Sequence, residues 1–572
     1  MKSYFLDFIR ERYIFEKGEN NRLAILLTDD NSNWIGLTQG LKNIGIPFCL
    51  TKDFKKAKKH QIIMVYPSLD ENYDDNDSLK KFVAKGGTLI CFQPSCMSDL
   101  FGYEISGKSE DHFEITFLSF PNQEKTQTCI LSDVLPASNR LKVVAFSKIS
   151  GESLAQYGNN KSAIISNNFG KGKSFAIGLD LGEILTKSFK GIQPELKIIN
   201  SGQVNFGGDP FLHFIKNIYR HYEPNAVTAE ISPFNKSLTV AITHDLDCLS
   251  SIENAVEYAN YENSQNIKTT YFILTKYIRD YIDFDFYESK TIPVVKELKK
   301  IGMEIASHSV CHSYVFDDFI MGTGEEQYPS YQPYVVNLHT TIGGSILGEL
   351  RVSKYLLEDL SENVISFRAG YLSFPKLLPQ ALSSCGFSFD SSFSIERSWT
   401  YLPFQLFNSK DDNFLTNIVE IPITFQDHLT PRLSKRLEEA IKLAEKISIN
   451  GGLFVLLIHP TIFGEKFRFE KKFIKAVRHY SWFDSISEIG HFWLARSKIQ
   501  LDVIDNFSKK TLLIHSEESI KGLTIQIPKR WKLEENFDKN NLEIVQINDK
   551  IVIGEIKKSL KAPISIYFDV LD

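Results

Sequence analysis

The stretch from Leu238 to Cys248 constrains the fold more than any other part of the sequence. Its first residues, Leu238 to Ile242, form an apolar run with the length and composition of a buried β-strand. Asp245 and Asp247 follow, two residues apart at the end of that strand, so their carboxylates point the same way. They would repel each other unless a cation or an arginine lay between them. The stretch therefore predicts a strand whose end meets positively charged partners.

Four further polar clusters follow at or near the ends of apolar segments. In chain order these are Ser307–His312, Phe367–Tyr371, Phe389–Ser392 and Leu456–Pro460. The first contains His308 and His312, which are four residues apart. On a helical turn both imidazoles would lie on one face and could bind one metal ion, provided that the backbone there is helical. The order of the five clusters predicts one shared site.

That order resembles the polysaccharide deacetylase family, also called the NodB-homology or carbohydrate esterase family 4 type, over about residues 238 to 497. Each motif alone is weak, but the set is specific. The resemblance implies a distorted (β/α) barrel for residues 237–498. It also implies a metal-dependent hydrolase acting on carbon–nitrogen (non-peptide) bonds, which removes N-acetyl groups from a polysaccharide or glycan precursor.

The resemblance assigns the metal and the base. Asp247, His308 and His312 would hold one divalent ion, with zinc as the first expectation and cobalt, manganese or nickel as alternatives. Asp245 would stay off the metal and act as the general base. Arg368 would pair with Asp245 and keep it ionised.

The remaining roles concern the acid and the substrate. His459 would be the general acid that protonates the leaving amine, and Asp390 would orient its imidazole. The backbone N–H of Tyr371 would stabilise the oxyanion, and Leu457 would contact the acetyl methyl group. The expected partner is an N-acetylated glycan.

Three departures from the family pattern leave the substrate open. Leu246 separates the two aspartates that many members place side by side, Gly370 stands where a proline is usual, and no tryptophan follows closely after Asp390. One alternative is hydrolysis of another amide, such as a ureide or a formamido sugar. Another is a catalytically inactive scaffold that binds carbohydrate.

The N-terminal part alternates apolar strands with helical segments, which predicts a doubly wound parallel sheet for residues 1–223. The expected elements are Leu23–Leu27, Trp34–Asn43, Ile62–Tyr66, Asp77–Lys85 and Thr88–Phe92. A β-rich insertion or edge is expected at 104–165, and a hairpin at Gly170–Gly178. The pattern is similar to class I glutamine amidotransferase-like domains. A non-catalytic role is predicted, because Cys91 lies inside a strand and Cys96 lacks flanking glycines.

Three other segments complete the predicted organisation. Residues 224–236, with two prolines, are expected to form a linker. Tyr314–Gly344 is the longest irregular stretch and is expected to be a lid over the site. Residues 499–572 alternate short strands and predict a small β-sandwich, with a hairpin turn at Asn548-Asp549.

Composition excludes several classes of protein. The formal net charge is -5 over 572 residues, and the one basic cluster, Lys55–Lys59, is too short for a nucleic-acid binder. The seven cysteines are scattered without a Cys-x-x-Cys pair, which favours a reducing compartment. No signal peptide is recognised, and no apolar run reaches the roughly 18 residues that span a bilayer. A cytoplasmic protein is expected, of unpredicted oligomeric state.

Overall fold

The computed structural model describes residues 18–109, 114–118, 128–130, 143–158, 160–191, 207–409, 411–506, 508–534, 542–557 and 563–571. The chain divides into two compact units. The first combines the chain up to Asn235 with the chain from Ala495 onward, and the second is Lys236–Leu494. The C-terminal strands therefore group with the N-terminal part. The domain boundaries expected from the sequence stay a prediction.

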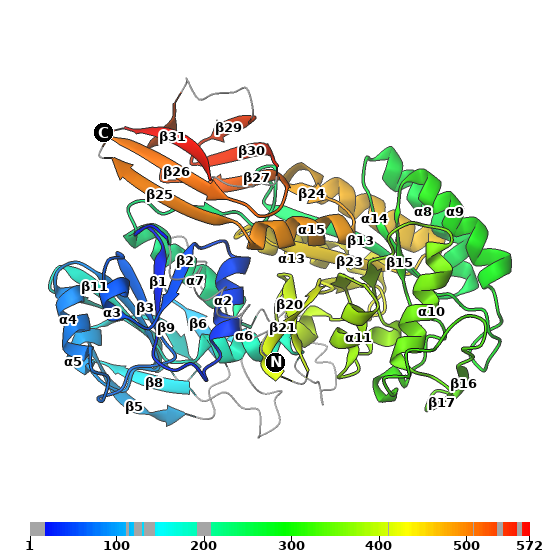
Figure 1. Cartoon of the computed structure of the whole chain (residues 1–572), viewed down its shortest axis with the longest axis horizontal. Helices are drawn as coiled ribbons and strands as arrows, with labels where there is room; N and C mark the ends of the chain where they lie inside the picture. The colour runs from blue at the N-terminus through cyan, green and yellow to red at the C-terminus, as the bar shows by residue number, and fades with distance from the viewer. Residues whose placement is uncertain are drawn as a thin grey trace. The chain divides into compact units, whose positions relative to one another are not determined.

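The first unit contains a parallel sheet built as expected (Figure 1). Its parallel strands are, in spatial order, β2 (Phe48–Thr51), β1 (Leu23–Leu27), β3 (Ile62–Tyr66), β4 (Thr88–Phe92) and β11 (Gly172–Ile177). The intervening helices include α2 (Trp34–Asn43) and α4 (Asn76–Ala84). Strands β1, β3 and β4 are wholly buried, as continuous apolar runs in a parallel sheet should be.

The same sheet continues beyond β11 with antiparallel strands. β10 (Ser162–Phe169) pairs with β11 through the predicted hairpin, where Gly170 has a φ of 61° that suits glycine. The further strands are β9 (Glu152–Tyr157), β6 (Glu114–Phe117), β7 (Thr128–Ile130), β8 (Val143–Lys148) and β5 (Tyr103–Ser109). The sheet is therefore mixed, and the β-rich stretch expected at 104–165 forms its antiparallel part.

The C-terminal strands of this unit form two four-stranded antiparallel sheets. One consists of β25 (Gln500–Asn506), β26 (Lys509–His515), β31 (Ile564–Val570) and β28 (Trp531–Leu533). The other consists of β12 (Thr228–Ala229), β27 (Ile520–Gln526), β30 (Lys550–Ile556) and β29 (Ile544–Ile547). The turn Asn548-Asp549 joins β29 to β30, as predicted.

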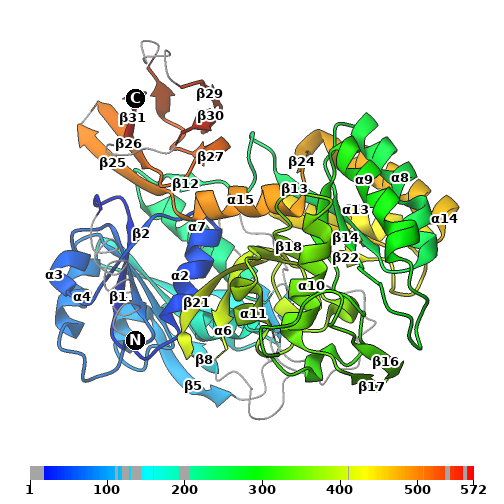
Figure 2. The same cartoon turned by 45° about the vertical axis from the view of Figure 1, so that its right-hand side comes forward.

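The second unit is built around a ten-stranded sheet (Figure 2). Its path is β20 (Phe404–Asn408), β21 (Asp411–Glu420), β19 (Phe389–Asp390), β18 (Ser366–Phe367), β15 (Glu304–Ser307), β14 (Thr270–Ile273), β13 (Leu238–Leu246), β23 (Leu453–Ile458) and β22 (Phe425–Gln426), with β24 (Ser481–Phe483) also on β13. All neighbours from β21 to β22 are parallel. Their carboxyl ends therefore meet at one edge, whereas closure into a barrel stays a prediction.

Helices connect these parallel strands. They include α8 (Leu249–Ser264), α9 (Ile292–Ile301), α10 (Ile346–Glu358), α13 (Leu437–Ser448) and α14 (Phe463–Val477). In both views α8 and α9 lie side by side (Figures 1 and 2). The predicted lid is less irregular than expected, because it contains the hairpin of β16 (Tyr334–Asn337) and β17 (Thr340–Ile342). None of the helices in the described ranges combines the length and hydropathy of a bilayer-spanning segment.

Candidate functional site

Strand β13 delivers the first aspartate to the carboxyl edge of the sheet. Side chains alternate along a strand, so Ala241, Thr243 and Asp245 share one face of β13. Ala241 packs in the apolar core of the unit, and Asp245, at the end of the same row, is 2% exposed. Ligands of parallel α/β sheets bind outside this carboxyl edge. The strand therefore places a buried carboxylate where a site is expected.

Arg368 is the partner of Asp245. Its Nη1 donates to Asp245 Oδ1 over 2.7 Å and to Thr243 Oγ1 over 3.0 Å, and its other nitrogens bond to Ser391. The guanidinium is fully buried and lies 4.1 Å from the centre of the Phe272 ring. Burial alone would raise the pKa of Asp245, but Arg368, followed by His308 and His459, holds it below its ordinary value. Asp245 is thus a buried, ionised carboxylate held by Arg368.

The two histidines of the second cluster follow β15, but not on a helix. Ser309 and His312 have φ values of 71° and 52°, so the segment is an irregular turn. The helical condition set by the sequence argument is therefore not met. The turn nevertheless brings the His308 and His312 rings to 5.0 Å between centroids. Two residues with left-handed backbone fold the turn back on itself, and this brings the two histidines together although they are not on a helix.

The orientation of His308 follows from its backbone contact. Its Nδ1 lies 2.9 Å from the carbonyl oxygen of Arg368, which can only accept, so Nδ1 carries the proton. Nε2 then presents a lone pair, 3.8 Å from Asp245 Oδ2. Burial is the main cause that lowers the pKa of His308, and it lowers that of His312 to about 3. Both imidazoles are therefore neutral at pH 7, which is the form that binds metals.

Glu349 holds this turn, and nothing in the sequence singled it out. Its Oε2 accepts the backbone N–H groups of Val310 and Cys311 over 2.8 and 2.9 Å. Its Oε1 accepts from the Tyr331 hydroxyl, within the predicted lid, over 2.8 Å. Ser345 caps the helix that carries Glu349. One buried carboxylate thus ties the histidine turn and the lid segment to α10.

His459 lies at the end of β23 and is gripped by Asp427. Its Nδ1 is 2.9 Å from Asp427 Oδ1, and its backbone N–H donates to Asp427 Oδ2 over 2.8 Å. Lys466 bonds to the same carboxylate over 2.6 Å. Burial alone would lower the pKa of His459, but Asp427, with help from Asp247 and Asp245, raises it to about 9. The imidazole is therefore held protonated, 4.0 Å from Asp245 Oδ2 and 3.6 Å from Asp247 Oδ2.

The partner of His459 is thus Asp427 and not Asp390. Strand order explains the error: β22 pairs with β23 so that Gln426 faces Leu457, and the next residue, Asp427, reaches His459. Asp390 lies on β19, five strands away from β23 along the sheet. There it is fully buried, and its Oδ1 accepts from Ser392 Oγ over 2.6 Å. Burial raises its pKa to about 6.

The predicted metal ligands fit a divalent ion in chemistry and only partly in position. Asp247, His308 and His312 offer one carboxylate and two neutral imidazoles, a donor set suited to zinc. Among the described residues, two groups of three bring their donor atoms within 4.8 Å of one another, and this trio is not one of them. They are Asp427, His428 and His459, and His244, Glu262 and Glu470. In the first, His428 Nε2 lies 3.2 Å from His459 Nε2.

The two predicted substrate contacts differ in exposure. Tyr371 is 48% exposed, with its ring 4.5 Å from that of His312. Leu457 is 2% exposed and packs in the core. The departure at Gly370 has a structural reason, because a Cβ there would lie 2.6 Å from Cδ2 of His312. A side chain at this position would displace the His312 ring.

Comparisons with known proteins were made by sequence and by structure. No protein-family model matches the chain, and no curated protein matches it. Among solved structures, it is similar to a Mycobacterium smegmatis protein described as a polysaccharide deacetylase, with 16% identity, a TM-score of 0.36, and coverage of 49% of this chain and 98% of that one.

Two further structures are similar to a comparable extent. One is the Xyl-CE4 domain of a multidomain xylanase from the hindgut metagenome of Trinervitermes trinervoides, with 14% identity, a TM-score of 0.28, and coverage of 45% of this chain and 90% of that one. The other is a peptidoglycan N-acetylglucosamine deacetylase, with 14% identity, a TM-score of 0.28, and coverage of 46% of this chain and 90% of that one.

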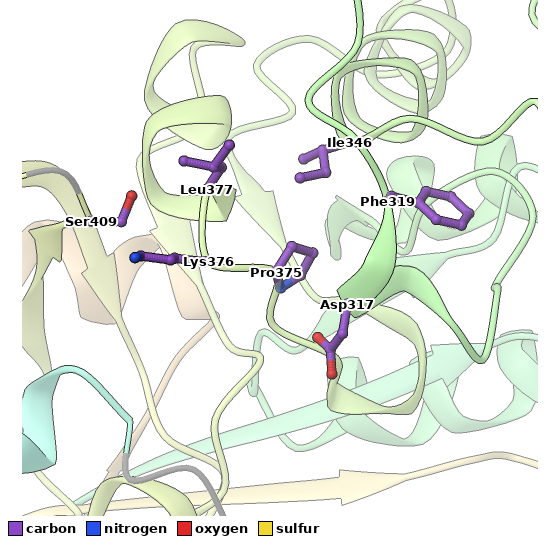
Figure 3. A pocket seen from close by; sticks show the side chains of 7 residues that line it. All are labelled: Asp317, Phe319, Ile346, Pro375, Lys376, Leu377 and Ser409. Atoms are coloured by element: carbon purple, nitrogen blue, oxygen red, sulfur yellow. The ribbon is translucent and has the colours of Figure 1, made fainter.

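A cavity of about 530 Å³ opens beside the lid segment (Figure 3). It is lined by Asp317, Phe319, Ile346, Pro375, Lys376, Leu377 and Ser409. Asp317 accepts the backbone N–H of Phe374, which ties the lid to the chain just after Tyr371. None of the predicted site residues lines this cavity. Its lining combines one acid, one amine and one hydroxyl with apolar groups.

Proposed function

We propose that the chain is a metal-dependent hydrolase that removes N-acetyl groups from a polysaccharide or glycan precursor. One observation carries the proposal: the Asp245 carboxylate and the His459 imidazole face each other at 4.0 Å, and each is held by its own buried partner. Two titratable groups whose surroundings push their pKa values apart are the mark of an acid and base pair. Two of the solved structures named above are described as deacetylases, which is the reaction proposed here.

In this proposal Asp245 accepts the proton of the attacking water, and its bond to Arg368 keeps it ready to do so. His459 gives its Nε2 proton to the nitrogen that leaves as the C–N bond breaks. Asp427 stabilises the imidazolium before that transfer and holds the ring in place. The backbone N–H of Tyr371 would receive the oxyanion, and Leu457 would border the methyl group. Water and the amide thus yield acetate and a free amine.

Asp247, His308 and His312 would hold the divalent ion, with zinc as the first expectation. A bound ion of this kind lowers the pKa of water and polarises a carbonyl group. The neutral imidazoles, the free Nε2 of His308 and the neighbouring Asp247 support this assignment. The donor atoms of the trio do not all lie within 4.8 Å of one another, so binding one ion through all three would require side-chain movement.

The finer organisation belongs to the same proposal. We assign the catalytic domain to 237–498 as a distorted barrel, a non-catalytic amidotransferase-like module to 1–223, a linker to 224–236 and a sandwich to 499–572. The parallel sheet of the second unit supports the first assignment. Burial raises the pKa of the Cys91 thiol well above its ordinary value, which makes it a poor nucleophile. This supports the non-catalytic assignment of residues 1–223.

The proposal is tested by incubating the zinc-loaded protein with N-acetylated glycans and measuring acetate. Wild type should release acetate and His459→Gln should release almost none. His479→Gln, which changes an exposed histidine of the same unit, should match wild type. If no acetate appears but formate is released from a formamido sugar, or ammonia from a ureide, the substrate is one of the alternative amides. Glycan binding without any product would support the inactive scaffold.

A further inference from the structure

Behind strand β13, on the face opposite Asp245, three ionisable side chains meet. His244 comes from β13, Glu262 from α8 and Glu470 from α14. All three are fully buried, and their donor atoms lie within 4.8 Å of one another. Because residues alternate along a strand, His244 points away from the face that carries Asp245. This buried trio is therefore separate from the proposed catalytic site.

The imidazole of His244 presents its Nε2 to both carboxylates. Its Nδ1 lies 3.2 Å from the carbonyl oxygen of Ile458, which can only accept, so Nδ1 carries a proton. Nε2 lies 2.7 Å from Glu262 Oε1 and 3.7 Å from Glu470 Oε2. An Nδ1–H bonded to a backbone carbonyl with Nε2 facing acidic oxygens is the orientation that metal-binding histidines adopt.

The two glutamates differ in how they are satisfied. Glu262 Oε2 accepts from Thr269 Oγ1 over 2.7 Å and from the Tyr271 hydroxyl over 2.8 Å, an arrangement that fixes the carboxylate. Neither oxygen of Glu470 receives an N–H or hydroxyl donor from the described residues, and its carboxyl lies within hydrogen-bonding reach of the Glu262 carboxyl. Burial, and then the charge of Glu262, raises the pKa of Glu470 well above its ordinary value.

The Tyr258 hydroxyl adds a second unsatisfied group. It is buried and has no hydrogen-bond partner in the described part of the chain, and its ring lies 4.9 Å from that of His244. A buried polar atom without a partner destabilises the folded state. Two such groups around one imidazole indicate that an occupant completes the cluster.

We propose that His244, Glu262 and Glu470 bind a structural divalent cation of the zinc class. A doubly charged ion balances two carboxylates beside a neutral imidazole, and imidazole and carboxylate are ordinary zinc ligands. Because the ligands are fully buried, the ion enters as the chain folds. It would tie α8 and α14 to the strand that carries Asp245. The competing occupants are two protons, or a proton and a water.

The test is the zinc content of the full-length protein, saturated with Zn²⁺ and desalted, for wild type, Glu470→Gln and Asp247→Asn. Glu470→Gln should lose about one ion per chain, and it should do so in the Asp247→Asn background as well. Glu420→Gln is the matched control, since Glu420 is also a fully buried glutamate with a raised pKa. Wild-type zinc content in Glu470→Gln would overturn the proposal in favour of protons or water.

A second measurement needs no variant and covers the case in which Glu470→Gln does not fold. Crystals of wild type grown with Zn²⁺ should show an anomalous peak at the zinc edge between His244 Nε2 and the two carboxylates. A water or no peak there would overturn the proposal. The proposed function is judged separately: a peak at His244 with none beside Asp247 would support the structural ion while contradicting the hydrolase assignment.

Discussion

Each unit of this chain contains a run of parallel strands, and the carboxyl edges of the two runs differ in the side chains that they carry. Among the residues that the structure describes, no group of three acids and histidines with converging donor atoms lies at the ends of the buried strands β1, β3 and β4 of the first unit, and Cys91 is buried in the core. In the second unit β13, β15 and β23 end in Asp245, His308 and His459. The comparison shows that the fold supplies an edge, whereas the side chains at that edge supply the chemistry.

The largest difference between the two edges should appear in activity. Asp245→Asn removes the proposed base and should lower acetate release by about 10²–10⁴-fold. Cys91→Ser, the corresponding change in the first unit, should leave the rate unchanged because the thiol is buried. The measurement is the initial rate of acetate release under saturating zinc. Equal losses in both variants would break the comparison.

The next effect concerns two arginine–aspartate pairs, one in each unit. Arg368→Met removes the guanidinium that binds the buried Asp245 carboxylate, which should cost about 3–5 kcal/mol of unfolding free energy. Arg22 binds Asp502 through two nitrogens, but Asp502 is 21% exposed, so Arg22→Met should cost less, about 1.5–3 kcal/mol. Urea unfolding of both variants checks the order, and the reverse order would contradict it.

A third prediction sharpens the site itself. Asp427→Asn weakens the hydrogen bond that holds the His459 ring and should reduce the rate of acetate release by about 10–100-fold. Asp390→Asn changes a carboxylate bonded to Ser392 and should have the smaller effect. The rates of acetate release are compared under conditions in which both variants are fully folded. A larger loss from Asp390→Asn would restore the assignment made from the sequence.

Glu349→Gln is expected to act through the histidine turn. The neutral amide accepts more weakly from the N–H groups of Val310 and Cys311, so zinc affinity should fall by about tenfold. Competition with a chromophoric chelator measures this affinity. An unchanged affinity would show that the turn keeps its shape without the carboxylate.

The smallest effect is a pH dependence in the first unit. Burial lowers the pKa of His213 to about 3, whereas an unfolded histidine titrates near 6.5. Below pH 6.5 the His213 side chain binds a proton in the unfolded state but not in the folded state. The free energy of unfolding of this unit therefore falls by up to about 1.4 kcal/mol for each pH unit down to roughly pH 3. His213→Gln should lack this loss in urea titrations between pH 7 and 5. Parallel titrations of both proteins would contradict it.

Sequence reasoning succeeded where a residue and its role are local. The apolar runs at Ile62–Tyr66 and Thr88–Phe92 are strands with the predicted bounds, because strands that are buried along their whole length are continuously apolar. Arg368 contacts Asp245 although the two are 123 residues apart, and it was the family resemblance, not a local pattern, that implied this pair.

It failed where the role depends on which strands are neighbours. Asp427 was missed because it follows the two-residue strand β22, whose position beside β23 is not written in any local pattern. Glu349 was missed because its effect crosses from a helix to a loop 38 residues away. Such contacts are set by tertiary packing and cannot be predicted from the spacing of residues in the sequence.

The most direct test of the central claim is acetate release from an N-acetylated glycan by metal-stripped protein before and after zinc is restored. Stripped wild type should release no measurable acetate, zinc should restore the release, and zinc should not restore it in Asp245→Asn. The absence of acetate from every N-acetylated glycan with zinc-loaded wild type would contradict the account.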